Sequence, residues 1–232
     1  MSHMTNAELQ DIAESARTQL ESADATEIVK WAHETFGTRL VITASMADGV
    51  LCHLVSQIAP GLRVVFLDTG YHFAETIGTR DAIAAEYRIV VDSVHHPLSV
   101  ADHEASHGSL YETNPDLCCF MRKVLPLDLA LRPYQAWASG VRRSESATRA
   151  QTPVIDWDSR RHMVKINPLA YWTDDQVNSY IKEHGIIENP LRQLGYTSIG
   201  CAPCTQPIQE GADIRSGRWA GHSKTECGLH EH

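Results

Sequence analysis

The feature that most constrains the fold is a repeat of short apolar runs, each followed by a polar turn and a segment with helical spacing. The runs at 39–43 and 63–67 are rich in Val, Ile, Leu and Phe, which predicts buried strands. Residues 50–58 and 75–86 carry apolar side chains at helical intervals, and another strand is predicted at 87–91. Strands that alternate with helices predict an α/β fold with a mainly parallel, twisted sheet flanked by helices on both faces.

The remainder of the chain follows a less regular pattern. Residues 92–115, rich in His, Ser and Pro, are interpreted as a long loop or lid. The other predicted elements are helices at about 8–34, 118–131 and 174–183, the last capped by Thr173, and strands at 135–139 and 163–166. We interpret 5–210 as a single domain and 211–232 as a mobile polar C-terminal tail. Residues 1–4 are interpreted as an expression-vector remnant.

The bulk composition is that of an ordinary soluble globular protein, with 232 residues, 43% hydrophobic and 21% charged. The formal net charge of −9 argues against non-specific binding of nucleic acid. No segment is long and apolar enough to span a membrane, and the polar N-terminus does not resemble a secretory signal. The expected location is therefore the cytoplasm, where clustered cysteines favour metal binding or catalysis over disulfides.

Two polar turns directly follow predicted buried strands. They read Thr43-Ala44-Ser45-Met46-Ala47-Asp48-Gly49 and Asp68-Thr69-Gly70. In an open parallel sheet, ligands bind beyond the carboxyl ends of the strands, where the backbone N–H groups of the next helix suit a phosphate. Either turn alone is better explained as an ordinary strand-to-helix connection, but together they favour a nucleotide site. The candidate contacts are Thr43, Ser45, Asp48, Asp68 and Gly70.

Four of the six cysteines have the arrangement of metal ligands: the contiguous pair Cys118-Cys119 and the spaced pair in Cys201-Ala-Pro-Cys204. Adjacent residues on a helix project about 100° apart, which suits a single small metal ion poorly. An iron–sulfur cluster, whose irons are spread apart, accepts both thiolates. Structural zinc is the alternative, because the spaced pair is also a common half of a zinc site. Cys52 lies in an apolar helical segment and is interpreted as core packing.

Cys227 stands apart, in the polar sequence Lys224-Thr225-Glu226-Cys227-Gly228-Leu229-His230. Lys224 and His230 favour the nucleophilic thiolate form, whereas Glu226 opposes it. An incidental surface thiol explains this local sequence equally well. Basic residues in turn-like settings complete the set of candidates, because arginines near a ligand site suit an anionic substrate. Each of them alone is better explained as a solvated surface charge. They are Lys123, Arg142, Arg143, Arg149, Arg215 and Arg218.

Together these motifs resemble the assimilatory adenylylsulfate reductases, within the wider phosphosulfate reductase family. The resemblance runs from about Leu40 to His230 and rests on motifs that occur in the family's order. These are Phe66-Leu67-Asp68-Thr69-Gly70-Tyr71-His72-Phe73, Cys118-Cys119-Phe120-Met121-Arg122-Lys123-Val124-Leu125-Pro126-Leu127, Pro168-Leu169-Ala170-Tyr171-Trp172-Thr173, Cys201-Ala202-Pro203-Cys204-Thr205, Gly217-Arg218-Trp219 and the segment from Lys224 to His230.

The resemblance implies a fold of the adenine-nucleotide α-hydrolase type and the reduction of adenosine 5′-phosphosulfate to sulfite and AMP. By similarity, Cys227 attacks the sulfur of the sulfate group, AMP leaves, and an S-sulfocysteine forms on the enzyme. Thioredoxin then releases sulfite. This is covalent catalysis, which replaces one difficult reduction by two displacement steps. The resemblance leaves open whether the chain forms a homo-oligomer.

The four clustered cysteines are typical of the branch that uses adenylylsulfate, so the resemblance implies a [4Fe–4S] cluster on Cys118, Cys119, Cys201 and Cys204. It also implies substrate contacts from Lys123, Arg143, Arg215, Arg218 and His230, with Arg142 as the alternate for Arg143. The first turn departs from many relatives, because Ala44 stands where a hydroxyl is common and Ala47 precedes a single acidic residue. No thioredoxin-like domain follows, as it does in plant relatives, so a separate reductant is expected.

Two rival functions remain from the sequence. One is a cluster-bearing reductase that prefers, or also accepts, the 3′-phosphorylated nucleotide. The other is a zinc-stabilised nucleotide-binding module without catalysis, in which Cys227 is inert.

Overall fold

The computed structural model describes residues 3–209, 211 and 213–229. Its strands are β1 (Leu40–Thr43), β2 (Arg63–Asp68), β3 (Val90–His95), β4 (Ala136–Ser139), β5 (Ile155–Asp158) and β6 (Met163–Ile166). Its α-helices are α1 (Asn6–Gln19), α2 (Ala25–Phe36), α3 (Val50–Ile58), α4 (Ala74–Glu86), α5 (Val100–His107), α6 (Leu110–Thr113), α7 (Pro115–Cys119), α8 (Leu125–Leu131) and α9 (Asp174–His184). A π-helical turn, η2 (Phe120–Val124), joins α7 to α8, and the 3₁₀ turns are η1 (Gly37–Arg39), η3 (Arg143–Glu145), η4 (Ala147–Arg149), η5 (Pro190–Leu194) and η6 (Ala202–Cys204).

The strands form one sheet in the order β3-β2-β1-β4-β6-β5. Every neighbouring pair is parallel except β5 and β6, which are antiparallel. The order of the strands reverses between β1 and β4, and in open α/β sheets this switch point is where a crevice forms at the carboxyl ends of the strands. Ile42 of β1 lies opposite both Val64 and Ala138, so the carboxyl ends of the three strands lie side by side.

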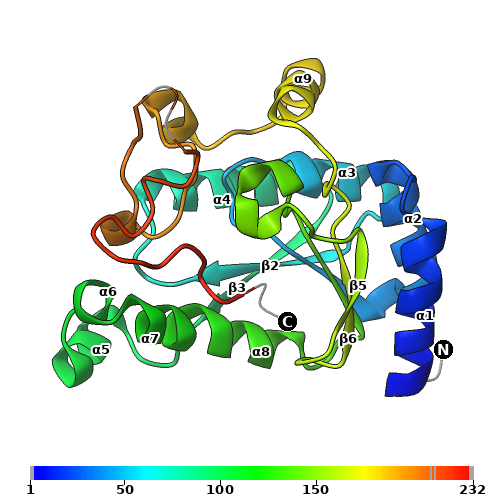
Figure 1. Ribbon diagram of the computed structural model, residues 1–232, viewed down its shortest axis with the longest axis horizontal. Coiled ribbons are helices and arrows are strands. Elements are labelled where there is room, and N and C mark those ends of the chain that lie inside the picture. Colours follow the sequence, from blue (N-terminus) through cyan, green and yellow to red (C-terminus); the bar gives the residue numbers. More distant parts are fainter. Residues whose placement is uncertain (1–2, 210, 212, 230–232) are drawn as a thin grey trace.

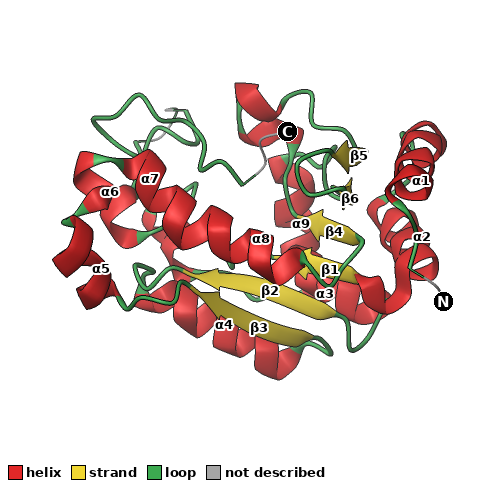
Figure 2. Ribbon diagram, turned by 90° about the horizontal axis from the view of Figure 1, so that it is seen from below, coloured by secondary structure: helices red, strands yellow, loops and turns green. Residues whose placement is uncertain are grey.

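Both faces of the sheet are covered, as Figures 1 and 2 show, with α3 and α4 on one side and α7 and α8 on the other. Leu40 and Ile42 of β1 pack into the larger core with α1, α2 and α3. Val41 faces the opposite way and packs against Leu127 and Leu131 of α8. Successive residues of a strand point to opposite faces, so a strand buried on both sides reads as a continuous apolar run. The predicted α/β fold with a mainly parallel sheet is confirmed.

Several predicted elements differ from the structure in their limits. The helix expected at about 8–34 is two helices, each starting at a capping box, in which Thr5 and Asp24 accept the N–H of the residue three positions on. The strand expected at 87–91 starts at Val90, because residue 87 closes the last turn of α4. The long loop expected at 92–115 contains α5 and α6. The predicted cap at Thr173 is confirmed, since its hydroxyl accepts the N–H of Gln176.

Strand β5 was not anticipated from the sequence. Its four residues, Ile-Asp-Trp-Asp, carry too little apolar character to indicate a buried strand, and it lies at the edge of the sheet as the antiparallel partner of β6. Within the described ranges, no helix combines the length and the apolar character needed to cross a membrane.

The C-terminal segment, residues 211–229 as far as they are described, forms no helix or strand but packs against the body (Figure 1). Gln206 donates its N–H to the carbonyl of Gly217 at 2.8 Å, and Trp219 donates its N–H to Cys204 at 3.0 Å. Leu229 contacts the smaller core beside α8. The expected mobility of this segment stays a prediction.

Lys165 of β6 makes the stability of this fold depend on pH. It is 1% exposed, and burial lowers its pKa to about 8 although Asp158 opposes the shift. Between about pH 8 and the ordinary pKa of lysine, the folded protein is neutral at this side chain and unfolding takes up a proton. Burial of the charged form therefore lowers the free energy of unfolding below pH 8, and this loss becomes smaller as the pH rises. We expect Lys165→Met to raise the free energy of unfolding by about 1–3 kcal/mol at pH 7.

Urea unfolding at pH 7, 8.5 and 10 measures this effect, and the difference between variant and parent should shrink as the pH increases. The exposed Lys30→Met is the matched control, with no pH-dependent difference expected. A difference for Lys165→Met that stays constant with pH would show that the lowered pKa is not the cause.

Candidate functional site

A pocket of about 500 Å³ opens at the carboxyl ends of β1, β2 and β4. This volume suits a small-molecule ligand. The pocket lies at the switch point of the sheet, because Thr43 of β1 and Ser139 of β4 both line it. Residues far apart in the sequence line it, including Thr43, Ser45, Asp48, Lys123, Ser139, Arg142, Arg149, Arg192, Arg215, Arg218 and Cys227.

The first predicted turn forms one wall of this pocket. The hydroxyl of Thr43 donates to the carbonyl of Ala138 at 3.2 Å, which ties β1 to β4 at the pocket floor. Asp48 accepts the N–H of Val50 at 3.1 Å at the start of α3, and its other oxygen pairs with Arg192 at 2.8 Å. The structure therefore brings Thr43, Ser45 and Asp48 to one ligand-sized pocket, as the sequence pattern led us to expect.

The second predicted turn lies elsewhere: neither Asp68 nor Gly70 lines this pocket. Asp68 accepts the N–H of Gly70 at 2.9 Å and faces Arg80 of α4 at 3.4 Å. Gly70 has a φ of +76°, and a Cβ at this position would lie 2.6 Å from Val100. The residue between them, Thr69, is fully buried and places its hydroxyl 3.3 Å from the sulfur of Cys201. Asp68 and Gly70 therefore lie outside the lining of the larger pocket, and their expected contact with the substrate stays a prediction.

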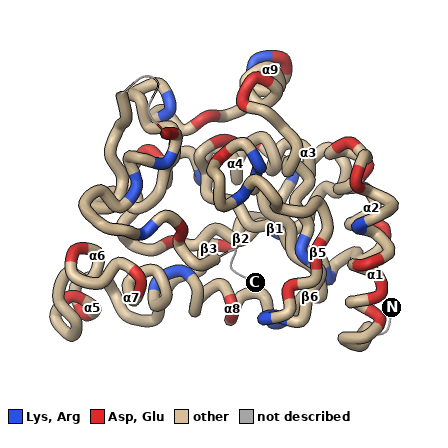
Figure 3. Tube along the Cα trace, viewed as in Figure 1, with Lys and Arg blue, Asp and Glu red and all other residues tan. Residues whose placement is uncertain are grey.

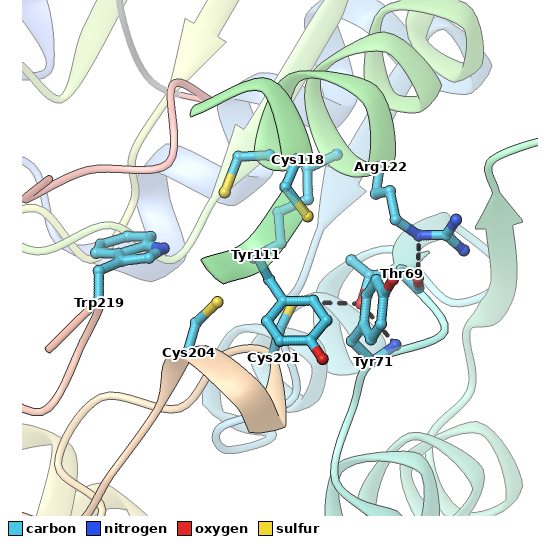
Figure 4. A pocket seen from close by; sticks show the side chains of 10 residues that line it. Thr69, Tyr71, Tyr111, Cys118, Arg122, Cys201, Cys204 and Trp219 are labelled. Atoms are coloured by element: carbon cyan, nitrogen blue, oxygen red, sulfur yellow. Dashed lines mark hydrogen bonds between the residues drawn. The ribbon is translucent and has the colours of Figure 1, made fainter. Parts of the chain in front are cut away.

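The four clustered cysteines line a second, smaller cavity together with Lys123 and Trp219. Figure 4 shows Cys118 pointing from its helix towards Cys201 and Cys204, with the ring of Trp219 at one side. α7 starts at Pro115, and the side chain of Asn114 caps it by accepting the N–H of Leu117 at 3.1 Å. The cap and the proline fix the start of the short helix that presents Cys118 and Cys119.

The electrostatics of this cavity centre on a buried lysine. Burial and repulsion from the neighbouring thiols raise the pKa of Cys118 to about 12 and that of Cys204 to about 11. Burial also raises the pKa of Cys201, but the charge of Lys123 and the hydroxyl of Thr69 outweigh it, and the net shift is downwards. Burial lowers the pKa of Lys123, yet the neighbouring thiolates raise it more, so its ammonium stays charged.

Within the described part of the chain, no three Cys, His, Asp or Glu side chains are arranged to hold a single metal ion. The donor set is nevertheless four sulfur atoms around one cavity, largely shielded from water, with Cys118, Cys119 and Cys201 each at most 8% exposed. Four thiolates are the ligands that a [4Fe–4S] cluster or a structural zinc ion requires. The chemistry of these residues therefore fits such a group.

Cys227 lies between the two cavities. It lines the larger pocket and is half-buried. Lys123 lines this pocket as well as the cysteine cavity, so the two spaces meet at its side chain. The C-terminal segment thus brings a free thiol to the point where the pocket meets the cysteine cavity.

Lys123, Arg215 and Arg218 surround this point with positive charge. Figure 3 shows basic positions of the C-terminal segment facing those that follow α7. The Nε atoms of Arg215 and Arg218 are buried and have no hydrogen-bond partner among the described residues. Buried donors without partners are costly, so an anion that accepts from them is expected to bind here.

The arginine pair at 142 and 143 divides between two environments. Arg143 does not line the pocket: it donates to the carbonyl of Thr152 at 2.7 Å, pairs with Glu21 at 3.5 Å and lies over the ring of Tyr171. Arg142 lines the pocket and pairs with Asp174 at 2.6 Å. The alternate, Arg142, is therefore the residue of this pair that can meet a ligand. The other expected contact, His230, lies outside the described residues.

Comparison with known proteins identifies the family. Residues 39–207 match the phosphoadenosine phosphosulfate reductase domain. The chain belongs to the phosphoadenosine phosphosulfate reductase family. The resemblance drawn from the motifs is confirmed, and the chain is an oxidoreductase. A relative from Streptomyces coelicolor, named adenosine 5′-phosphosulfate reductase, is 54% identical over 97% of this chain and 96% of its own length.

Solved structures of the family and of its fold agree with this assignment. A phosphoadenylyl-sulfate (PAPS) reductase from Candida auris, in a phosphate complex, is 30% identical, with a TM-score of 0.71 over 87% of this chain and 97% of its own. An FMN adenylyltransferase from Candida glabrata is 13% identical, with a TM-score of 0.55 over 87% of this chain and 75% of its own. This second likeness shows the fold alone.

Some residues of the site could not be assigned from the sequence. Trp219 is 3% exposed and closes the cysteine cavity. Arg149, one of the basic candidates, forms a partly buried ion pair with Glu226, the residue before Cys227. The sequence places these two residues 77 positions apart, and no spacing rule connects them. Only the position of Glu226 beside a candidate nucleophile marked it for attention.

Proposed function

We propose that this family member reduces adenosine 5′-phosphosulfate to sulfite and AMP, with thioredoxin as the reductant, in sulfate assimilation. The observation that carries the proposal is the position of Cys227. It lies at the junction of a nucleotide-sized pocket, three cationic side chains and a cavity lined by four further cysteines. The relatives named adenosine 5′-phosphosulfate reductase support this choice of substrate.

Different parts of the pocket suit the nucleoside end and the sulfate end of such a substrate. The turn that carries Thr43, Ser45 and Asp48 lines one part of the pocket, where it suits the nucleoside and its phosphate. Lys123, Arg215 and Arg218 lie near Cys227 and suit the sulfate. The unpartnered Nε donors of Arg215 and Arg218 then find their acceptors in the bound anion.

In the first step the thiolate of Cys227 attacks the sulfur of the sulfate group. A sulfur–sulfur bond forms, the bond between that sulfur and the bridging phosphate oxygen breaks, and AMP departs with the electron pair. In the second step a thiolate of reduced thioredoxin attacks Sγ of Cys227 and sulfite leaves. A second thioredoxin thiol then resolves the mixed disulfide, so the two electrons come from the thioredoxin dithiol.

The chain's own cations stabilise the charge that moves during the first step. Lys123 is buried and charged, and Arg215 and Arg218 are held over the ring of Trp219, at 5.8 and 4.4 Å from its centre. Side chains held in place in a water-poor site stabilise a transition state without reorganisation. Cys118, Cys119, Cys201 and Cys204 would hold a [4Fe–4S] cluster, which would supply an electrostatic influence on the sulfate and not the electrons.

The deciding experiment is mass spectrometry of the intact protein after addition of adenosine 5′-phosphosulfate without thioredoxin. We expect one added SO₃ group, mapped to Cys227, which reduced thioredoxin then removes as sulfite. A protein that binds the nucleotide and carries no adduct would contradict the mechanism. The choice of substrate is tested by offering adenosine 5′-phosphosulfate and its 3′-phosphorylated form together under the same single-turnover conditions. Preferential use of the 3′-phosphorylated nucleotide would show that adenosine 5′-phosphosulfate is not the preferred substrate.

Gly200 provides a precise test of the role of Arg218. A Cβ at Gly200 would lie 2.2 Å from Nη2 and 2.4 Å from Cζ of the Arg218 guanidinium, so Gly200→Ala forces this flexible group to move. We expect substrate affinity to fall by about tenfold to a hundredfold, the range for losing a hydrogen bond to a charged group. Gly78→Ala in α4 is the control, because a Cβ there meets nothing within 4 Å. Unchanged affinity in Gly200→Ala would exclude Arg218 as a substrate contact.

A further inference from the structure

Glu226, the residue before Cys227, is bound by cationic and hydroxyl groups of the body. Its Oε1 accepts from Nε of Arg149 at 2.9 Å and from the hydroxyl of Thr148 at 3.0 Å. Its Oε2 accepts from Nη2 of Arg149 at 2.8 Å and from Nη2 of Arg215 at 3.0 Å. The two contacts with Arg149 make a bidentate pair, the strongest form of this interaction. The side chains of Arg149 and Glu226 are 13% and 20% exposed.

Arg149 is therefore committed within the protein although it lines the substrate pocket. Its remaining terminal nitrogen, Nη1, donates to Glu145 at 2.6 Å, so all three guanidinium nitrogens already bind carboxylate oxygens. Arg215 and Arg218 differ, because each keeps a buried Nε without a partner among the described residues. Arg149 thus holds the C-terminal segment with all of its guanidinium nitrogens occupied, whereas Arg215 and Arg218 each keep one donor for an anion.

The charge of Glu226 persists at neutral pH. Burial raises its pKa, but the hydrogen bonds and charge of Arg149 and Arg215 outweigh burial, and the net shift is downwards. The pair with Arg149 consequently places no unbalanced negative charge beside Cys227, where an incoming sulfate has to approach.

Two further contacts hold the same segment. Lys224 pairs with Asp116 of α7, the helix that carries Cys118 and Cys119. Leu229 packs against the core beside α8, and its carbonyl accepts from Arg161 at 3.4 Å. Lys224 and Glu226 bind to different walls, α7 and η4, so the chain between them crosses the site. Of these three contact residues of the segment, Lys224, Glu226 and Leu229, Glu226 is the one directly adjacent to Cys227 in the chain.

We propose that Glu226 is a positioning residue, which holds Cys227 over the pocket through Arg149 during attack and must release Arg149 before a protein reductant can reach the thiol. This inference rests on the proposed function, because it requires the C-terminal segment to be bound during formation of the Cys227 adduct and released during its reduction. Attack on the bound anion needs the docked segment. Reduction by a partner protein needs Cys227 to be accessible, whereas it is half-buried when Glu226 is bound.

The test is to measure the two half-reactions separately in Glu226→Gln, which keeps the size of the side chain and removes its charge. We expect formation of the Cys227 adduct at saturating nucleotide to slow by about tenfold to a hundredfold, as for a lost hydrogen bond to a charged group. The nucleotide dissociation constant should stay within about twofold of the parent's value. Release of sulfite from preformed adduct by thioredoxin should be as fast as in the parent, or faster.

Arg149→Gln and the double variant complete a cycle. If the two residues act as one anchor, the double variant should be no slower in adduct formation than either single variant. Asp92→Asn is the matched control, because Asp92 also accepts from an arginine, Arg63, through both oxygens, and lies on edge strand β3. We expect it to leave both half-reactions unchanged.

Two outcomes would overturn the proposal. Tighter nucleotide binding in Glu226→Gln, with an unchanged rate of adduct formation, would show that the carboxylate competes with the substrate for Arg149. Equal slowing of both half-reactions, together with a lower melting temperature, would show a purely structural role. Failure of the parent protein to form any adduct would contradict the proposed function. The role of Glu226 is tested separately, by the difference in rate between the variants and the parent.

Discussion

Cys227→Ser should abolish sulfite production from adenosine 5′-phosphosulfate while nucleotide binding persists. Serine keeps the size and position of the side chain, but its hydroxyl is far less acidic and less nucleophilic than a thiol at neutral pH. We expect the turnover rate to fall by about 10⁴-fold or more, the scale for removing a covalent nucleophile. Cys227 is half-buried in a segment without helix or strand, so the fold should survive. Thioredoxin-coupled turnover and isothermal titration with AMP measure the two effects.

Ser223→Ala is the control for this variant. It changes an exposed residue of the same segment, and turnover should stay close to that of the parent. Residual sulfite formation by Cys227→Ser at more than about a hundredth of the parent rate would rule out Cys227 as the nucleophile, since no other route in the proposed chemistry forms the adduct.

Cys201→Ser should prevent the cysteine cavity from holding the proposed cluster and should disturb the site around it. Cys201 is 8% exposed, lies 3.3 Å from the hydroxyl of Thr69, and is the thiol group that most strongly supports the charge of Lys123. Without the thiolate and the cluster, the buried ammonium of Lys123 loses its balancing charge. Breaking such a buried pair costs about 3–5 kcal/mol. We expect loss of bound iron, loss of the brown colour and a large decrease in the melting temperature.

Iron content and visible absorption of anaerobically purified protein measure this prediction. Cys52→Ala is the comparison for iron content, because Cys52 lies in the core of α3 and not in the cysteine cavity. If the parent is colourless and holds one zinc ion per chain, the four cysteines form a structural zinc site, and the cluster assignment is wrong. If Cys201→Ser retains iron at the parent level, Cys201 is not a ligand.

Much of the fold was accessible from the sequence because both faces of its central strands are buried. Residues 40–42 and 64–66 are buried and apolar on both sides, and this produced continuous runs that could be recognised without a structure. The outer strands were harder to predict. β3 and β5 lie at the edges of the sheet, and Val90, the first residue of β3, is 43% exposed, so the apolar signal that marks a strand is weak there.

The candidate site was accessible only in part. Thr43, Ser45 and Asp48 share the pocket with Lys123, Arg215 and Arg218, as expected from turns and motifs. Asp68, Gly70 and Arg143 were grouped with them by sequence context, yet they lie outside the pocket lining. Arg142 is extended, whereas Arg143 begins the 3₁₀ turn η3, so the two side chains leave the backbone in different directions. Motif membership therefore did not determine which of Arg142 and Arg143 faces the ligand.

The sequence by itself determined the class of fold and a four-sulfur donor set, because both depend on residue type and local spacing, whereas Cys227 became the candidate nucleophile through the resemblance of its motif to a known family. Only the tertiary structure decided how these parts meet. It brought Cys227 to the junction of pocket and cysteine cavity, and it paired Glu226 with Arg149, 77 positions earlier in the chain. Such pairs form when loops from different strands converge at one edge of the sheet. Their contacts depend on the packing of the whole domain, which no local pattern of residues encodes.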